Sequence, residues 1–157
     1  MMLQILLAFA GTVGFSIIFN VPRRELALCG IAGACGWFVL QLTMGFIPNA
    51  GVADTFFAAM AVTCISRIFS FMRKMPVTVY MIPGIIPLVP GTGIYHTMFN
   101  AIMGDYTEAL LWGIQTLRTA GVIAVGLLVV LTLPPKLFSF VADACINIFA
   151  IRRRLRR

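Results

Sequence analysis

Long apolar runs separated by short polar breaks dominate the pattern of this chain. A run of about 20 apolar residues is long enough to cross the hydrocarbon core of a bilayer as an α-helix. Residues 77–103 form such a segment, although prolines and glycines interrupt it. The pattern therefore predicts an all-α, polytopic transmembrane helix bundle of about five spans, with the fourth broken by Pro and Gly. The other predicted spans are residues 3–19, 26–47, 55–72 and 109–133.

The C-terminal part follows a different pattern. Residues 137–151 are too few for a regular span, and a polar residue recurs there every four positions, at Ser139, Asp143 and Asn147. We expect an interfacial helix on the cytoplasmic surface, held by the arginines of the terminal RRRLRR. The chain thus divides into a transmembrane domain, residues 1–136, and an amphipathic C-terminal helix with a basic tail, residues 137–157.

Composition supports insertion into a membrane. The chain has 157 residues, of which 61% are hydrophobic and 11% charged, and its mean hydropathy is +1.00. These values are far from those of a soluble domain. The formal net charge of +7 alone could suit nucleic acid, but no basic face with interleaved aromatic residues occurs, so we expect no nucleic-acid partner. The apolar surface is expected to contact the lipid bilayer.

Basic residues predict the orientation. The loops at residues 48–54 and 104–108 have none, whereas the other span ends carry Arg23, Arg24, Arg73, Lys74 and Lys136. Because basic residues concentrate on the cytoplasmic side, we expect the N-terminus outside and the C-terminus in the cytoplasm. The first apolar run precedes its positive charges, unlike a signal peptide, so we expect it to be a retained helix.

The fourth span contains MIPGIIPLVPGTGIYHTM, residues 81–98, with three prolines and three glycines. Each proline lacks an amide hydrogen and so frees a backbone carbonyl at membrane depth. Such groups are costly in lipid, so irregular backbone persists only where protein or a water-filled cavity satisfies it. We therefore expect the unpaired groups to face a wet interior, as in the discontinuous helices of transporters. Prolines that merely kink a helix for packing are the alternative.

The sequence PGTG, residues 90–93, predicts a second half-helix at residues 94–103, with Thr92 as its N-cap. Open amides at the start of this helix would bind a carboxylate. His96 and Asn100 are four residues apart and so share one polar face. His96 could instead be a hydrogen-bonded structural histidine, and Tyr95 an ordinary aromatic anchor.

Arg118 lies about nine residues into the fifth span, where an arginine does not easily reach the membrane surface. An anionic substrate group is one candidate partner for it, and Asp105 or Glu108 on a neighbouring turn is the other. The residues expected to bind substrate are therefore Pro87, Pro90, Gly91, Thr92, Gly93, Tyr95, His96, Asn100 and Arg118.

Two further patterns predict helix packing. In the third span a polar stripe at helical spacing should face the bundle interior, although snorkelling to the membrane surface suffices to explain its arginine. Its members are Thr63, Ser66, Arg67 and Ser70. In the second span Gly30, Gly33, Ala34 and Gly36 should let another helix approach closely, and Gln41 is interpreted as a packing residue.

No pattern of residues indicates catalysis. The sequence contains no Ser/His/Asp, Cys/His, HExxH or P-loop arrangement, and its single histidine is too little for a metal cage. Its four cysteines show no CxxC spacing and are interpreted as reduced packing residues: Cys29, Cys35, Cys64 and Cys145. We expect neither enzymatic activity nor a cofactor or metal.

At NVPRREL, residues 20–26, and IPGIIPLVPGTGIYHTM, residues 82–98, the chain resembles the small subunit of the bacterial threonine/serine exporter (ThrE) family. The resemblance implies a two-component inner-membrane exporter, completed as a hetero-oligomer by a larger subunit. It implies threonine and serine as substrates, or succinate as in some paired versions. The arginine-rich extension departs from the family and is a candidate to dock the partner. The family's proline-glycine segment corresponds to Pro83, Pro87, Pro90, Gly91, Thr92, Gly93 and Tyr95.

Two functions follow from these observations. The first is a subunit of a secondary transporter that exports a small carboxylate-bearing metabolite, driven by the proton gradient, with His96 or a partner carboxylate as proton carrier. The alternative is a non-transporting membrane scaffold that stabilises a partner, in which the broken span serves packing alone.

Overall fold

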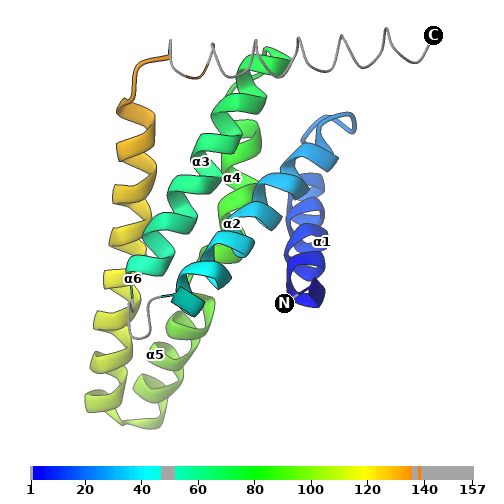
Figure 1. Cartoon of the computed structure of the whole chain (residues 1–157). Coiled ribbons are helices and arrows are strands. Elements are labelled where there is room, and N and C mark those ends of the chain that lie inside the picture. The colour runs from blue at the N-terminus through cyan, green and yellow to red at the C-terminus, as the bar shows by residue number, and fades with distance from the viewer. Residues whose placement is uncertain (1, 47–51, 136–137, 139–157) are drawn as a thin grey trace, which may run out of the picture.

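The computed structural model describes residues 2–46, 52–135 and 138, and every regular element within them is a helix. The predicted all-helical fold is confirmed. Successive helices run in alternating directions, except that α5 continues the direction of α4 (Figure 1). The elements are α1 (Met2–Ile18), α2 (Leu26–Phe46), α3 (Ala53–Arg73), α4 (Thr78–Ile85), the 3₁₀ turn η1 (Ile86–Leu88), α5 (Gly91–Met103) and α6 (Tyr106–Thr132).

Length and hydropathy identify three to four membrane spans among these helices. The helices α2, α3 and α6 are each long and apolar enough to cross a bilayer. The pair formed by Thr78–Leu88 and Gly91–Met103 is bent by 53° and gives a fourth span if both helices belong to one crossing. At 17 residues, α1 is apolar but shorter. The protein is therefore a multi-pass membrane protein, and the predicted count of about five spans is approximate.

Small residues bring helices α1 to α4 together around α2, which packs against α1, α3 and α4. A Cβ atom at Gly33 would collide with the Thr12 side chain of α1, and one at Gly36 would collide with Val62 of α3. The predicted close approach at these glycines is confirmed. The buried core beside them consists of Leu40, Ala58, Ala59, Val62, Leu88 and Ile123.

The polar stripe of α3 faces the interior, as predicted. Thr63, Ser66 and Arg67 are buried. The Arg67 guanidinium binds the end of α6, where its Nη1 donates to the carbonyl of Val130 at 2.6 Å and to that of Leu133 at 2.9 Å. Unpaired carbonyls at a helix C-terminus carry partial negative charge, so Arg67 satisfies the end of α6. Sequence reasoning found the buried face but missed this contact.

Glu25 ties together the end of the bundle formed by residues 19–25 and 73–77, here called the basic end. The carboxylate of Glu25, in the connection before α2, accepts from Arg73 Nη2 at 2.7 Å and from the Tyr80 hydroxyl at 2.8 Å. Glu25 is only 6% exposed. The hydrogen bonds from Arg73 hold the pKa of the Glu25 carboxyl below its ordinary value, against the opposing effect of burial.

The α5–α6 hairpin extends beyond the other helices at the opposite end (Figure 1). Gly104, with a φ of 85°, ends α5, and Asp105 Oδ1 caps α6 by accepting from the Glu108 amide at 3.2 Å. Gly93 and Gly113 let the two helices approach closely, against Thr116 and Thr97 respectively. The predicted interfacial helix at residues 137–151 lies outside the described residues, apart from Phe138, whose ring lies 4.3 Å from the Arg67 guanidinium.

Candidate functional site

The prolines break the fourth span as predicted, but the protein itself satisfies the carbonyls that they free. Pro83 removes the donor to the carbonyl of Val79, which instead accepts from Cys29 Sγ at 3.4 Å. Pro87 frees the carbonyl of Pro83, which accepts from the Ile86 amide. The expectation that these groups stay unpaired toward a wet interior is therefore wrong, because Cys29 of α2 and the amides of the 3₁₀ turn supply donors.

The same holds for the third proline. Pro90 frees the carbonyl of Ile86, which accepts from the Val89 amide at 3.1 Å. The break nevertheless faces inward, since Pro83, Gly84 and Leu88 are all buried. The bend therefore positions side chains rather than open carbonyls.

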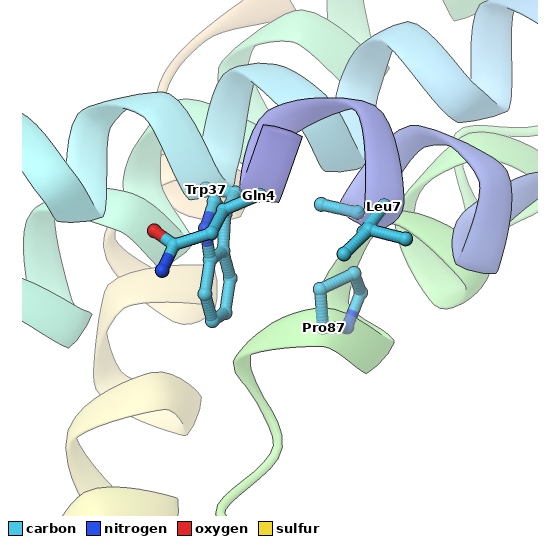
Figure 2. A pocket seen from close by; sticks show the side chains of 5 residues that line it. Gln4, Leu7, Trp37 and Pro87 are labelled. Atoms are coloured by element: carbon cyan, nitrogen blue, oxygen red, sulfur yellow. The ribbon is translucent and has the colours of Figure 1, made fainter. Parts of the chain in front are cut away.

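A cavity of about 230 Å³ lies beside the bend, between α1, α2 and η1. Gln4 and Trp37 lie next to each other on one side of it, and Leu7 and Pro87 lie across from them (Figure 2). Ala8 completes the lining, which is mainly apolar. Pro87, which the sequence placed in the site, thus contributes a wall of the cavity.

Unpaired polar atoms accompany this cavity. Within the described part of the chain, Trp37 Nε1 and Gln41 Oε1 are buried and have no hydrogen-bond partner. The Nε2 of Gln41 donates to Gln4 Oε1. A buried unpaired donor and a buried unpaired acceptor each cost free energy, so they are candidates to pair with a ligand that reaches the cavity.

Sequence reasoning missed Gln4 and Trp37 as cavity residues and read Gln41 as a packing residue. The available signal was weak: Gln4 and Gln41 are amides within two apolar runs. Nothing in the sequence brings these two positions together, because their proximity depends on how α1 packs against α2.

The first turn of α5 differs from the prediction. The helix begins at Gly91, not at residue 94, and its N-cap position is Pro90 without a side-chain hydrogen bond, so Thr92 is not the N-cap. The Gly91 amide donates to the carbonyl of Val89 at 2.8 Å, and the Ile94 amide to that of Pro90 at 3.2 Å. Gly91 and Thr92 are exposed, whereas Gly93 is buried against Thr116.

The polar face of α5 lies along α6. The His96 ring stacks on Trp112 with centroids 4.6 Å apart, and both His96 and Asn100 are half-buried. Tyr95 is exposed and stacks on Phe99 of its own helix at 5.8 Å. These residues form a second group, distinct from the residues that line the cavity at Pro87.

Arg118 belongs to neither group. Its side chain is exposed, as is Gln115, and it does not line the cavity. Asp105 caps α6 and Glu108 lies in its first turn, about 15 Å from Arg118 along the helix axis. Neither carboxylate is therefore on a turn that neighbours Arg118.

The fold and the bend together define a class of protein. A multi-pass helical membrane protein with an interrupted span beside a cavity has the construction of a membrane transporter. The family model described as threonine/serine exporter, ThrE, matches residues 4–133. The chain therefore belongs to the threonine/serine exporter family. No solved structure matches it.

Proposed function

We propose that this protein is one component of a secondary transporter that exports a small carboxylate-bearing metabolite across the bacterial inner membrane. The observation that carries the proposal is the bent fourth span, whose Pro87 lines a cavity of about 230 Å³ together with residues of α1 and α2. Membership of the exporter family supports the direction of transport. A larger subunit of the same family, forming a hetero-oligomer, is the proposed partner.

The polar atoms near the cavity favour threonine or serine over a dicarboxylate. Trp37 Nε1 is a donor and would pair with a carboxylate, while Gln41 Oε1 is an acceptor and would pair with an ammonium or hydroxyl group. An amino acid supplies both kinds of group. Ionised succinate supplies acceptors only and would leave the Gln41 oxygen unpaired.

The start of α5 and its polar face are proposed to serve a later step of transport. The exposed turn at Gly91 and Thr92 offers the positive end of a helix to a carboxylate that leaves the cavity. His96, stacked on Trp112, is the proposed proton carrier, with a partner carboxylate as the alternative. Tyr95 and Asn100 flank this path, whereas Arg118 lies apart from it.

Efflux of labelled threonine, serine and succinate from vesicles, with the chain alone and with its larger subunit, tests the proposal. We expect threonine and serine efflux from the complex, and a loss of about tenfold or more for Trp37→Phe, which removes one hydrogen bond to a charged group. Phe38→Leu, on the exposed face of α2, is the matched control and should transport normally.

A second variant separates transport from scaffolding. Gly91→Leu combined with Thr92→Val should assemble, because no atom lies within 4 Å of a Cβ at Gly91 and Thr92 is exposed. We expect lost efflux with an intact complex. Normal efflux by both this variant and Trp37→Phe would contradict the site, and absence of efflux by the wild-type complex would favour a scaffold.

A further inference from the structure

Arg118 lies on a side of α6 that no described element covers. The packing face of α6 is marked by buried Ile123, Gly126 and Val130, and the helix contacts α3 and α5. With 3.6 residues per turn, Arg118 points about 140° away from Ile123. The arginine therefore faces out of the bundle.

Arg118 stands in the middle of an exposed stripe, here called the outer stripe. Positions in this stripe alternate in steps of three and four residues, which is the spacing by which one helix packs along another. Gly121 has no atom within 4 Å of its Cβ position, so a second helix could approach closely there. The outer stripe consists of Leu111, Ile114, Arg118, Gly121, Val125 and Leu128, all of them exposed.

The depth of Arg118 makes bare contact with lipid unfavourable. It lies twelve residues from Tyr106 and fourteen from Thr132 in a helix of 27 residues. These separations correspond to about 18 and 21 Å along the axis, which is too far for the side chain to reach either end. An arginine near the centre of a membrane helix usually meets protein, water or a paired charge instead.

The described residues offer Arg118 no such charge. Glu25 is paired with Arg73 at the basic end, and Asp54 is buried at the start of α3. Asp105 and Glu108 lie at the far end of α6. Among the described residues, none forms a hydrogen bond or an ion pair with the Arg118 side chain.

We propose that the outer stripe is the docking surface for a transmembrane helix of a different protein, and that this helix places a carboxylate opposite Arg118. Charge selects this occupant, because an arginine pairs with a carboxylate in a bidentate geometry that a lipid chain cannot supply. A second copy of this chain does not fit. Two copies inserted in the same direction would bring one Arg118 against the other.

This docking surface is independent of the proposed substrate, and of whether the protein transports at all. It concerns α6, whereas the proposed cavity lies between α1, α2 and η1. Crosslinking at α6 can therefore succeed where the transport assays fail, and transport can be measured where crosslinking fails.

The experiment places a photo-reactive amino acid at Leu128 of the full-length chain in its native membranes. Leu128 and the control position Leu6 on α1 are comparably exposed, at 60% and 65%. We expect a crosslink from Leu128 to a membrane helix of another protein that carries Asp or Glu, identified by sequencing the crosslinked peptide. Arg118→Glu should reduce this crosslink about tenfold or more, and replacing the identified carboxylate residue with Arg should restore it.

Arg118→Leu distinguishes docking from folding. Leucine is favoured in a membrane helix, so this variant should insert at least as well as the wild type and yet lose the crosslink. Three outcomes would overturn the proposal: a crosslink joining two copies of this chain, a crosslink equally strong at Leu6, or a Leu128 crosslink that Arg118→Glu and Arg118→Leu leave unchanged. Absence of any protein crosslink at Leu128 would overturn it as well.

Discussion

Glu25 shows how one residue can hold a membrane bundle at its end. A single carboxylate joins the connection before α2 to the end of α3 through Arg73 and to α4 through Tyr80. Removing one partner from such a cluster leaves the others with unmet hydrogen bonds. The chain has five acidic residues in total, and the carboxylate of this one is paired within the bundle.

Glu25 should make stability depend on pH. Because its pKa is lowered in the folded protein, its contribution is fully present above the unfolded pKa, about 4.3, and is lost as pH falls through the lower folded value. We expect thermal unfolding in detergent to show a gap between wild type and Glu25→Gln that narrows below about pH 4. Arg73→Gln should remove the same dependence. A gap that stays constant with pH would contradict this account.

Gly93 is a residue whose size, rather than its flexibility, matters. A Cβ there would collide with the Thr116 side chain, whereas one at Gly91 would meet nothing within 4 Å. We expect Gly93→Ala to lower the free energy of unfolding by about 1–3 kcal/mol, a typical cost of overpacking, and Gly91→Ala to change it little. Thr116→Ala should recover much of the loss. The free energy of unfolding is measured by denaturant titration. Equal losses for Gly93→Ala and Gly91→Ala would contradict this account, because the α5–α6 contact would then have room for a methyl group at Gly93.

At the scale of elements, the bend in the fourth span depends on a donor from its neighbour. Cys29 of α2 is fully buried and donates to the carbonyl of Val79 that Pro83 frees. We expect Cys29→Ala to destabilise the protein by about 1 kcal/mol or more through the unpaired carbonyl, and Cys29→Ser, which keeps a donor, to cost less. Cys35→Ala, at a half-buried cysteine without a hydrogen bond to the break, is the matched control.

The bend was predictable because its cause is local. Pro83, Pro87 and Pro90 cannot donate wherever the chain folds, so the sequence alone places an interruption between α4 and α5. How the carbonyl freed by Pro83 is satisfied was not predictable, since its donor is Cys29, about fifty residues earlier in the chain. Gln4 and Trp37 escaped prediction for the same reason.

The predicted start of α5 was wrong by three residues. Thr92 fits the residue preference for a helix cap, but the chain turns at Pro90 and the helix begins one residue later. A proline with a fixed φ favours the entry into a helix and therefore competes with the threonine for that position. The sequence showed that Arg118 lies deep within its span. The direction in which Arg118 points was not predictable, because it depends on how α6 packs against α3 and α5.

At the scale of the whole molecule, the structure separates a body from a hairpin. The helices α1 to α4 pack around α2, whereas α5 packs mainly on α6, and α6 joins the body through α3. The bend between α4 and α5 is therefore the covalent link between two parts that share one further interface. A transporter needs two arrangements of packed elements, and this link and interface are where the present fold could supply them.

The distribution of charge over the whole molecule predicts its orientation. The Glu25–Arg73 ion pair shows that the connections carrying Arg23, Arg24, Arg73 and Lys74 meet at one end of the bundle, while Asp105 and Glu108 lie at the start of α6 at the other (Figure 1). Because basic residues remain in the cytoplasm, the basic end should be inside. In intact cells, with the native cysteines replaced by serine, an impermeant thiol reagent should label Tyr106→Cys and should label Thr78→Cys only after permeabilisation. The opposite pattern would show that the bundle is inverted. Labelling of both positions in intact cells would show that the protein inserts in both orientations, which would also contradict the prediction.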